Sequence, residues 1–203
     1  SIKPDLVKVH SNMLLCMLYG NYEQTSSLYE HKLWNDRHAE PLKSSMCKHK
    51  KGVDQEKKLH IGFVSGDFRN HAVSYFLESF FETYSKKKLK FYCYYNFYNE
   101  DVVTARFQKM VDGWRKIAGQ SDQVVVEMIQ ADNIDILVDL SGHTKNNRLL
   151  VFARKPAPIQ VAWFGYPNAT GLAAMDYMLT DYIMDPAGQS DQLHVEKLIR
   201  LPG

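Results

Sequence analysis

Short apolar runs alternate with longer amphipathic stretches from Leu59 to the end of the chain. A run of about four to eight apolar residues suits a buried strand, and the stretches between are long enough for crossover helices. This alternation predicts an α/β fold with a Rossmann-like, mostly parallel sheet that carries helices on both faces. The expected strands are residues 59–65, 91–96, 114–117, 134–140, 159–163, 177–180 and 197–201.

Apolar residues at helical spacing mark the helices. Between the first two strands they recur at offsets of 3, 4, 7 and 11 positions, at Val73, Phe76, Leu77, Phe80 and Tyr84. Ser121 is a suitable N-cap for another helix that runs through residue 129. The first 40 residues show the same spacing, which predicts a short helical segment of two helices broken near residues 20–21.

A basic stretch separates this helical segment from the sheet. Residues 43–58 carry six lysines against Asp54 and Glu56, with little that could be buried. We expect a solvated, mobile connector rather than a phosphate-binding segment. The predicted organisation is therefore a helical segment with its basic linker at 1–57 and a Rossmann-like lobe at 58–203.

Composition excludes several classes of protein. With 45% hydrophobic and 24% charged residues in 203, the chain is neither disordered nor a disulfide scaffold. The net charge of 25 − 23 = +2 does not indicate nucleic acid or an anionic membrane as a partner. The sequence shows no membrane-spanning apolar run and no secretory signal pattern, so a cytoplasmic protein with reduced Cys16, Cys47 and Cys93 is expected.

Polar, glycine-bearing loops follow three of the predicted strands. In an open α/β sheet, ligands bind at the carboxyl ends of the strands, where these loops meet. The first loop, residues 65–71, ends in His71 at the start of a helix, where the helix dipole favours a neutral imidazole that can accept a proton. His71 could therefore be a catalytic base, or Asn70 or His71 could merely cap the helix.

The second and third loops, residues 139–144 and 164–171, combine glycine with polar side chains. Each could be a plain strand-exit turn, but three such loops together indicate one shared ligand site. His31, Asp36 and His38 lack a second cluster and are not expected to hold a metal. The familiar dinucleotide, P-loop, zincin and α/β-hydrolase motifs are absent from the sequence.

Three segments carry a family resemblance. They read IGFVSGDFRNHAVSYFLESFFE at 61–82, ILVDLSGHTKNNRLLVFARKPAPIQVAWFGYPNATGLAAMDYMLTD at 136–181, and HVEKLIRLPG at 194–203. They resemble the O-linked N-acetylglucosaminyltransferase and SPINDLY family in its bacterial form. The stretch HSNMLLCMLYGNYEQ at 10–24 is similar to the helical segment that joins tetratricopeptide repeats to the catalytic region of such proteins.

The resemblance implies the first lobe of a two-lobed GT-B glycosyltransferase. The active site of such enzymes lies in the cleft between the lobes, so the second lobe is expected outside this chain, after Gly203. The resemblance gives His71 the role of base or orienting group. Substrate contacts are implied for Asp67, Asn70, His143, Thr144, Phe164, Gly165, Tyr166 and Pro167. Animal members have proline in place of Ala72 and tyrosine in place of His143.

The resemblance therefore implies a transferase that moves N-acetylglucosamine from UDP-GlcNAc to Ser or Thr of a protein acceptor. The nucleotide sugar is a substrate, and neither a metal nor another cofactor is expected. The second lobe and upstream tetratricopeptide repeats are the other expected partners, and this chain alone is expected to be inactive. One alternative is a noncatalytic partner-binding module with a vestigial site. Another is a metal-dependent hydrolase using Asp67, His71, Asp139 and His143.

Overall fold

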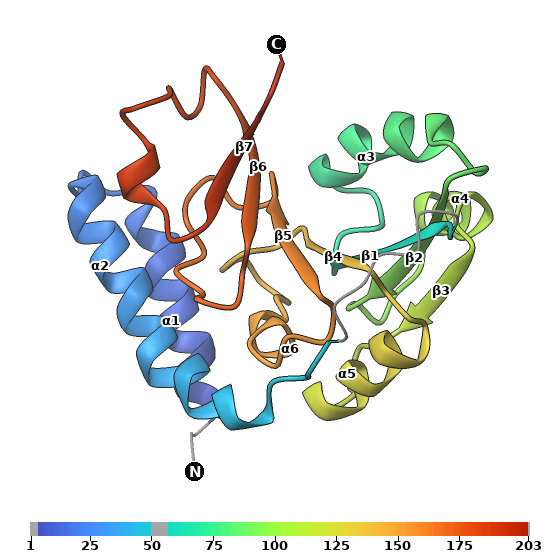
Figure 1. Ribbon diagram of the computed structural model, residues 1–203, viewed down its shortest axis with the longest axis horizontal. Helices are drawn as coiled ribbons and strands as arrows, with labels where there is room; N and C mark the ends of the chain where they lie inside the picture. Colours follow the sequence, from blue (N-terminus) through green and yellow to red (C-terminus); the bar gives the residue numbers. More distant parts are fainter. Residues whose placement is uncertain (1–3, 50–56, 203) are drawn as a thin grey trace.

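A seven-stranded parallel sheet forms the centre of the computed structural model, which describes residues 4–49 and 57–202 (Figure 1). The strand order is β3-β2-β1-β4-β5-β6-β7, and every neighbouring pair is parallel. The α/β Rossmann-like prediction is thus confirmed. The strands are β1 (Leu59–Ser65), β2 (Leu89–Tyr95), β3 (Gly113–Lys116), β4 (Ile136–Asp139), β5 (Ile159–Trp163), β6 (Tyr177–Asp181) and β7 (Lys197–Leu201).

The chain reverses its direction of winding between β1 and β4. Strands β2 and β3 follow β1 on one side, whereas β4 to β7 extend the sheet on the other side. Val64 of β1 pairs with Asp139 of β4, and Ser65 pairs with Tyr95 of β2, so the carboxyl ends of these strands meet at one edge. Such a switch point is where α/β proteins form ligand crevices.

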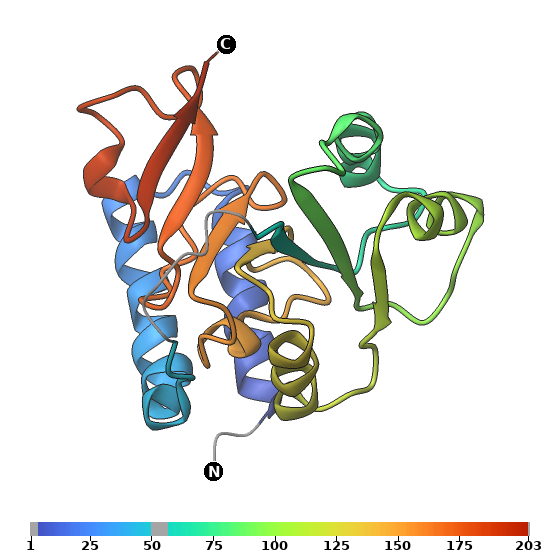
Figure 2. The same ribbon diagram turned by 45° about the vertical axis from the view of Figure 1, so that its right-hand side comes forward.

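Helices cover both faces of the sheet, as the two views show (Figures 1 and 2). On one face, α3 and α4 bury an aromatic core that includes Phe63, Phe81 and Phe107. On the other face, α5, α6 and the N-terminal helices pack over Val64 and Leu137. The helices are α1 (Pro4–Met17), α2 (Gln24–Trp34), α3 (Ala72–Thr83), α4 (Val102–Met110), α5 (Asp122–Ala131) and α6 (Leu149–Phe152), with short helical turns at Asn35–Ala39, Glu40–Ser45 and Asp191–Leu193.

The two expected N-terminal helices are present and break at the expected place. They share one hydrophobic core with the sheet, because Leu14 and Trp34 are fully buried against it. The indole Nε1 of Trp34 donates to Ser11 Oγ at 3.0 Å, which ties α2 to α1. The domain boundary between residues 57 and 58 stays a prediction.

The basic connector is partly ordered, which corrects the expectation for its first half. Residues 40–45 form a 3-10 helix, the Cys47 N–H donates to the Arg154 carbonyl at 2.9 Å, and the His49 ring bonds the Lys155 carbonyl at 2.7 Å. Met46 and Cys47 also pack against the core, although lysines dominate the composition of this stretch. Two isolated apolar residues and hydrogen bonds to backbone carbonyls form no periodic pattern that the sequence could show. Residues 50–56 lie outside the described residues.

The sequence pattern missed α4 and α6. The α4 helix buries only Val103, Thr104 and Phe107, and α6 is a single turn, so neither leaves a strong periodic signal. Ser121 caps α5 as expected, with its Oγ accepting the Val124 N–H at 3.3 Å. Across the described ranges, no helix is both long enough and apolar enough to cross a membrane.

Candidate active site

The loop after β1 is held by its own polar groups. Ser65 Oγ accepts the Asp67 N–H at 2.9 Å, and Ser74 Oγ of α3 donates to the Asp67 carbonyl at 2.5 Å. Arg69 donates to the Asp67 carboxylate at 3.1 Å and stacks over Phe97 at 4.7 Å. These bonds give the chain a defined path from the sheet into α3.

His71 is the N-cap of α3. Its Nδ1 accepts the Val73 N–H at 3.3 Å and lies 3.8 Å from Asp67 Oδ2. The side chain is 39% exposed, and nothing in the part of the chain that the structure describes bonds its Nε2. The capping interpretation is therefore correct, and it leaves the second ring nitrogen available to a ligand.

An exposed aromatic side chain on α3 contacts the third loop. Phe76 on α3 is 72% exposed, and its ring centroid lies 5.9 Å from that of Phe164, the first residue after β5. Phe164 also packs edge-on against Trp163 at 4.6 Å. The fold thus brings α3 and the third loop together and gives them a shared apolar surface.

The second and third loops interlock. A Cβ on Gly165 would lie 1.7 Å from the Leu140 carbonyl oxygen, and one on Gly142 would lie 2.2 Å from Tyr166 Cβ. Phe164 has a positive φ of 24° and Gly142 one of 51°, so both loops turn sharply at this contact. Only glycine permits this approach, which makes the two loops one rigid unit.

His143 and Tyr166 point into the protein rather than toward the open edge. His143 is 0% exposed, with Nε2 2.8 Å from the Thr170 carbonyl and Nδ1 3.2 Å from Ser11 Oγ. The Tyr166 hydroxyl lies 2.7 Å from Nε2 of the buried His31 on α2. Both side chains bond the N-terminal helices, but Tyr166 also lines a cavity described below, whereas His143 has no exposed surface. Substrate contact by either side chain stays a prediction.

Burial also decides the charge of this interior. Desolvation and the neighbouring His31 lower the pKa of His143 to about 3, and desolvation raises the pKa of Tyr166. Burial lowers the pKa of His10, His31 and His38 as well. The four histidines therefore pack as neutral side chains.

Two separate cavities are lined by different members of the predicted set of site residues. A cavity of about 710 Å³ lies between the α1–α2 turn and the loops after β5 and β6, and Phe164, Tyr166 and Pro167 line it. A second, of about 760 Å³, lies between α1 and the loops after β2, β3 and β4, and Thr144 lines it. His71 lines neither of these two cavities, so the structure does not gather all the expected residues around one closed pocket.

Sequence comparison identifies the family. The profile of glycosyl transferase family 41 matches residues 6–203. The chain belongs to this family. It is 40% identical over 206 residues to the probable UDP-N-acetylglucosamine–peptide N-acetylglucosaminyltransferase SPINDLY of Petunia hybrida, covering 99% of this chain and 22% of that protein. It is 35% identical to the probable transferase SEC of Arabidopsis thaliana, covering 72% of this chain and 15% of that protein.

A solved structure agrees with this assignment. A mutant of Thermobaculum terrenum O-GlcNAc transferase superposes with a TM-score of 0.91 at 38% identity, covering 98% of this chain and 38% of that one. The family 41 chain therefore spans about a fifth of the SPINDLY relative and less than half of the bacterial enzyme.

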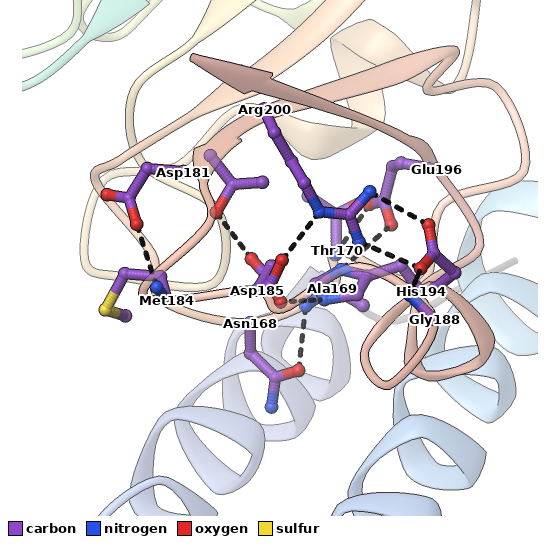
Figure 3. Close-up of polar contacts among 12 residues, drawn as sticks. Asn168, Ala169, Thr170, Asp181, Met184, Asp185, Gly188, His194, Glu196 and Arg200 are labelled. Atoms are coloured by element: carbon purple, nitrogen blue, oxygen red, sulfur yellow. Dashed lines mark hydrogen bonds and ion pairs between the residues drawn. The ribbon is translucent and has the colours of Figure 1, made fainter. Parts of the chain in front are cut away.

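A polar network missed by sequence reasoning supports the third loop of this family 41 chain (Figure 3). Glu196, buried before β7, accepts the Thr170 N–H at 2.7 Å and also the Thr170 hydroxyl. His194 bonds Asp185 at 3.1 Å. The network joins β7 to the loop that carries Phe164. The segment HVEKLIRLPG contains His194 and Glu196, but nothing in its spacing indicates their partners Asp185 and Thr170.

The other acidic candidates do not gather into a metal site. Asp139 accepts the N–H groups of Ser141 and Gly142 at 3.2 and 2.7 Å, and burial raises the pKa of its carboxyl to about 6. Within residues 4–49 and 57–202, no group of three His, Cys, Asp or Glu side chains is arranged to hold a metal ion. The hydrolase alternative therefore has no ligand set in the described part of the chain.

Proposed function

We propose that this chain is the N-terminal catalytic lobe of a nucleotide-sugar-dependent protein glycosyltransferase. The transferred sugar is N-acetylglucosamine, from UDP-GlcNAc to Ser or Thr of a protein acceptor. Family membership and the names of the SPINDLY and SEC relatives support this proposal. The observation that carries it for these residues is His71, the N-cap of α3 in the loop after β1. Its Nε2 has no bonding partner among the described residues, and Phe76 on the same helix contacts Phe164 of the third loop.

The chemistry of sugar transfer suits this arrangement. The transition state resembles an oxocarbenium ion, and negative charge moves onto the leaving diphosphate. The positive end of the α3 dipole stabilises developing negative charge, and His71 Nε2 orients or exchanges a proton with a hydroxyl or phosphate oxygen. The rings of Phe76 and Phe164 exclude water from one side of the sugar. Asp67, Asn70, Thr144, Gly165 and Pro167 remain proposed as substrate-contacting or loop-shaping residues.

The proposed partners follow from the same reaction. The second catalytic lobe closes the cleft, upstream tetratricopeptide repeats present the protein acceptor, and the nucleotide sugar needs no metal or further cofactor. The reaction is proposed to take place in the cytoplasm. Because half of the cleft is missing, the 203-residue chain should bind UDP-GlcNAc weakly, and a submicromolar Kd in calorimetry would contradict the division into lobes.

The experiment uses the full-length protein that contains this chain. It is incubated with a protein acceptor and, separately, UDP-GlcNAc, UDP-glucose or GDP-fucose, and Ser and Thr modification is read by mass spectrometry. We expect transfer from UDP-GlcNAc and a turnover about 10²- to 10⁴-fold lower in His71→Ala. His60→Ala is the matched control, since His60 lies at the opposite end of β1. Transfer from none of the donors would refute the proposal.

A noncatalytic partner-binding module is the second candidate. Tyr182, Ile183 and Met184 are exposed, Ile183 to 87%, and they border the 710 Å³ cavity together with the exposed Tyr22. A contiguous apolar surface of this kind is typical of contact with another protein. Retained protein binding with no transfer by the full-length protein would favour this candidate over the transferase.

A further inference from the structure

Asp101 joins two elements that the sequence separates by 30 residues. Its Oδ1 accepts the N–H groups of Val103 and Thr104, both at 2.9 Å, and so caps α4. Its other carboxylate oxygen, Oδ2, accepts the Asn70 N–H at 2.7 Å. One carboxylate therefore sets the start of α4 and also holds the Arg69–Asn70 peptide group, called the Asn70 peptide below, which lies one residue before His71.

The Asn70 contact lies at a sensitive point of the loop. Asn70 is exposed, and its side-chain oxygen accepts the Tyr75 hydroxyl at 3.0 Å. The Asn70 side chain therefore bonds α3, while its backbone N–H bonds Asp101. His71 follows directly and turns the chain into α3 with an extended backbone, φ −155° and ψ 153°. A shift of the Asn70 peptide would therefore rotate the His71 ring away from its present direction.

We propose that Asp101 is a positioning residue for His71. The Asp101 carboxylate holds the Asn70 peptide, and this peptide sets where His71 Nε2 points at the carboxyl edge of the sheet. The inference rests on the proposed transferase function only for its effect on turnover, since the hydrogen bond itself can be observed without activity.

The charge of Asp101 agrees with this role. The Asn70 N–H lowers the pKa of the Asp101 carboxyl, and the bonds from Thr104 and Val103 act in the same direction. Asp101 is thus a carboxylate at neutral pH. Since charged acceptors form shorter and stronger hydrogen bonds than neutral ones, a neutral amide at this position should hold Asn70 less well.

Asp101→Asn separates the two contacts. The amide oxygen can still cap α4, whereas the amide NH₂ that replaces Oδ2 cannot accept the Asn70 N–H. Asp101→Ala removes both contacts. Ser121→Ala is the matched control, because it removes the N-cap of α5 and lies outside the Asp101 network. Amide hydrogen exchange and imidazole NMR are measured on the 203-residue chain, and kcat, KM and thermal midpoint on the full-length protein.

In Asp101→Asn we expect the Asn70 amide to exchange about tenfold faster and the His71 imidazole resonances to move. With the ring misplaced, kcat should fall about 10- to 100-fold with KM changed much less, while the thermal midpoint stays at or above that of Ser121→Ala. Ser121→Ala should leave kcat, the Asn70 amide and the His71 resonances as in wild type.

Two results would overturn the proposal. One is an unchanged Asn70 amide with unchanged His71 resonances in Asp101→Asn. The other is a fall in kcat that Ser121→Ala reproduces, which would make the effect one of general stability. If the wild-type full-length protein transfers no sugar, the transferase proposal fails, and the NMR measurements still decide whether Asp101 positions His71.

Discussion

His71 Nδ1 accepts the backbone N–H of Val73 across 3.3 Å, and this bond determines where the neutral imidazole carries its proton. A backbone N–H can only donate, so Nδ1 must offer its lone pair and the proton lies on Nε2. In this state Nε2 donates a hydrogen bond to a ligand oxygen. To act as a base through Nε2, His71 must shift its proton to Nδ1 and give up the cap.

The first prediction concerns the tautomer of His71 and distinguishes its role as a helix cap from its role in turnover. Nitrogen-15 NMR of the chain should show His71 protonated at Nε2 wherever the ring is neutral. His71→Asn should keep the cap and the thermal midpoint, because asparagine is a good N-cap, but should lose turnover in the full-length protein. His71→Ala should lose turnover and also about 1 kcal/mol of stability. A neutral ring protonated at Nδ1 would contradict the capping geometry.

The second prediction concerns Asp139, whose pKa is raised by burial to about 6 from 3.8. The folded state prefers the protonated acid, so this group's contribution to stability is full below pH 3.8 and is lost as pH rises through 6. Asp139→Asn should therefore raise the free energy of unfolding at pH 7.5 by up to about 3 kcal/mol, less the cost of the one loop hydrogen bond that the amide NH₂ cannot accept. Urea unfolding at several pH values measures this, with Glu23→Gln as a surface control.

Asp139→Asn should also make the free energy of unfolding fall more steeply as the pH is lowered. His143 has a pKa lowered to about 3 from 6.5, so its contribution is full above pH 6.5 and falls as pH drops toward 3. In wild type, Asp139 opposes this slope between about pH 4 and 6. Once Asp139 is neutral, stability should fall with decreasing pH over that window, and an unchanged pH profile would contradict both assignments.

The third prediction concerns the contact of Gly165 with the Leu140 carbonyl. Gly165→Ala would place a Cβ 1.7 Å from that oxygen, so one of the two loops must move. We expect a loss of about 3 kcal/mol or more in the free energy of unfolding. Gly188→Ala is the control: it meets nothing within 4 Å, and its φ of 78° should cost only about 1–2 kcal/mol. An equal loss of unfolding free energy in Gly165→Ala and Gly188→Ala would show that the second and third loops do not interlock.

The fourth prediction concerns the hydrogen bond between Tyr166 and His31. Tyr166→Phe leaves the buried His31 Nε2 without its partner, at an expected cost of about 1–3 kcal/mol. Hydrogen exchange in α2 should become faster, because this bond joins α2 to the loop after β5. Tyr29→Phe, on the exposed side of α2, should change neither quantity. If amide hydrogen exchange in α2 of Tyr166→Phe is as slow as in wild type, the Tyr166–His31 bond does not hold α2 to the loop after β5.

Much of the fold could be predicted because its signals are local. Strand β1 and the buried face of α3 follow from apolar residues within one element, and the parallel sheet follows from their alternation. The strands start and end within about two residues of the expected positions, the usual precision of such boundaries. His71 could be placed at a helix start because its neighbours alone define that turn.

Only the tertiary structure decided which side chains face the open edge. His143 and Tyr166 lie in polar loops like His71 does, but the N-terminal helices, more than 100 residues earlier in the chain, contact them. Ser11 of α1 bonds His143, and His31 of α2 bonds Tyr166. Asp101 has the appearance of an ordinary helix cap until the fold brings Asn70 within 2.7 Å of it. Sequence pattern determines the elements, since it acts over a few residues. The site depends on contacts between distant segments, which exist only once the sheet and helices have packed together.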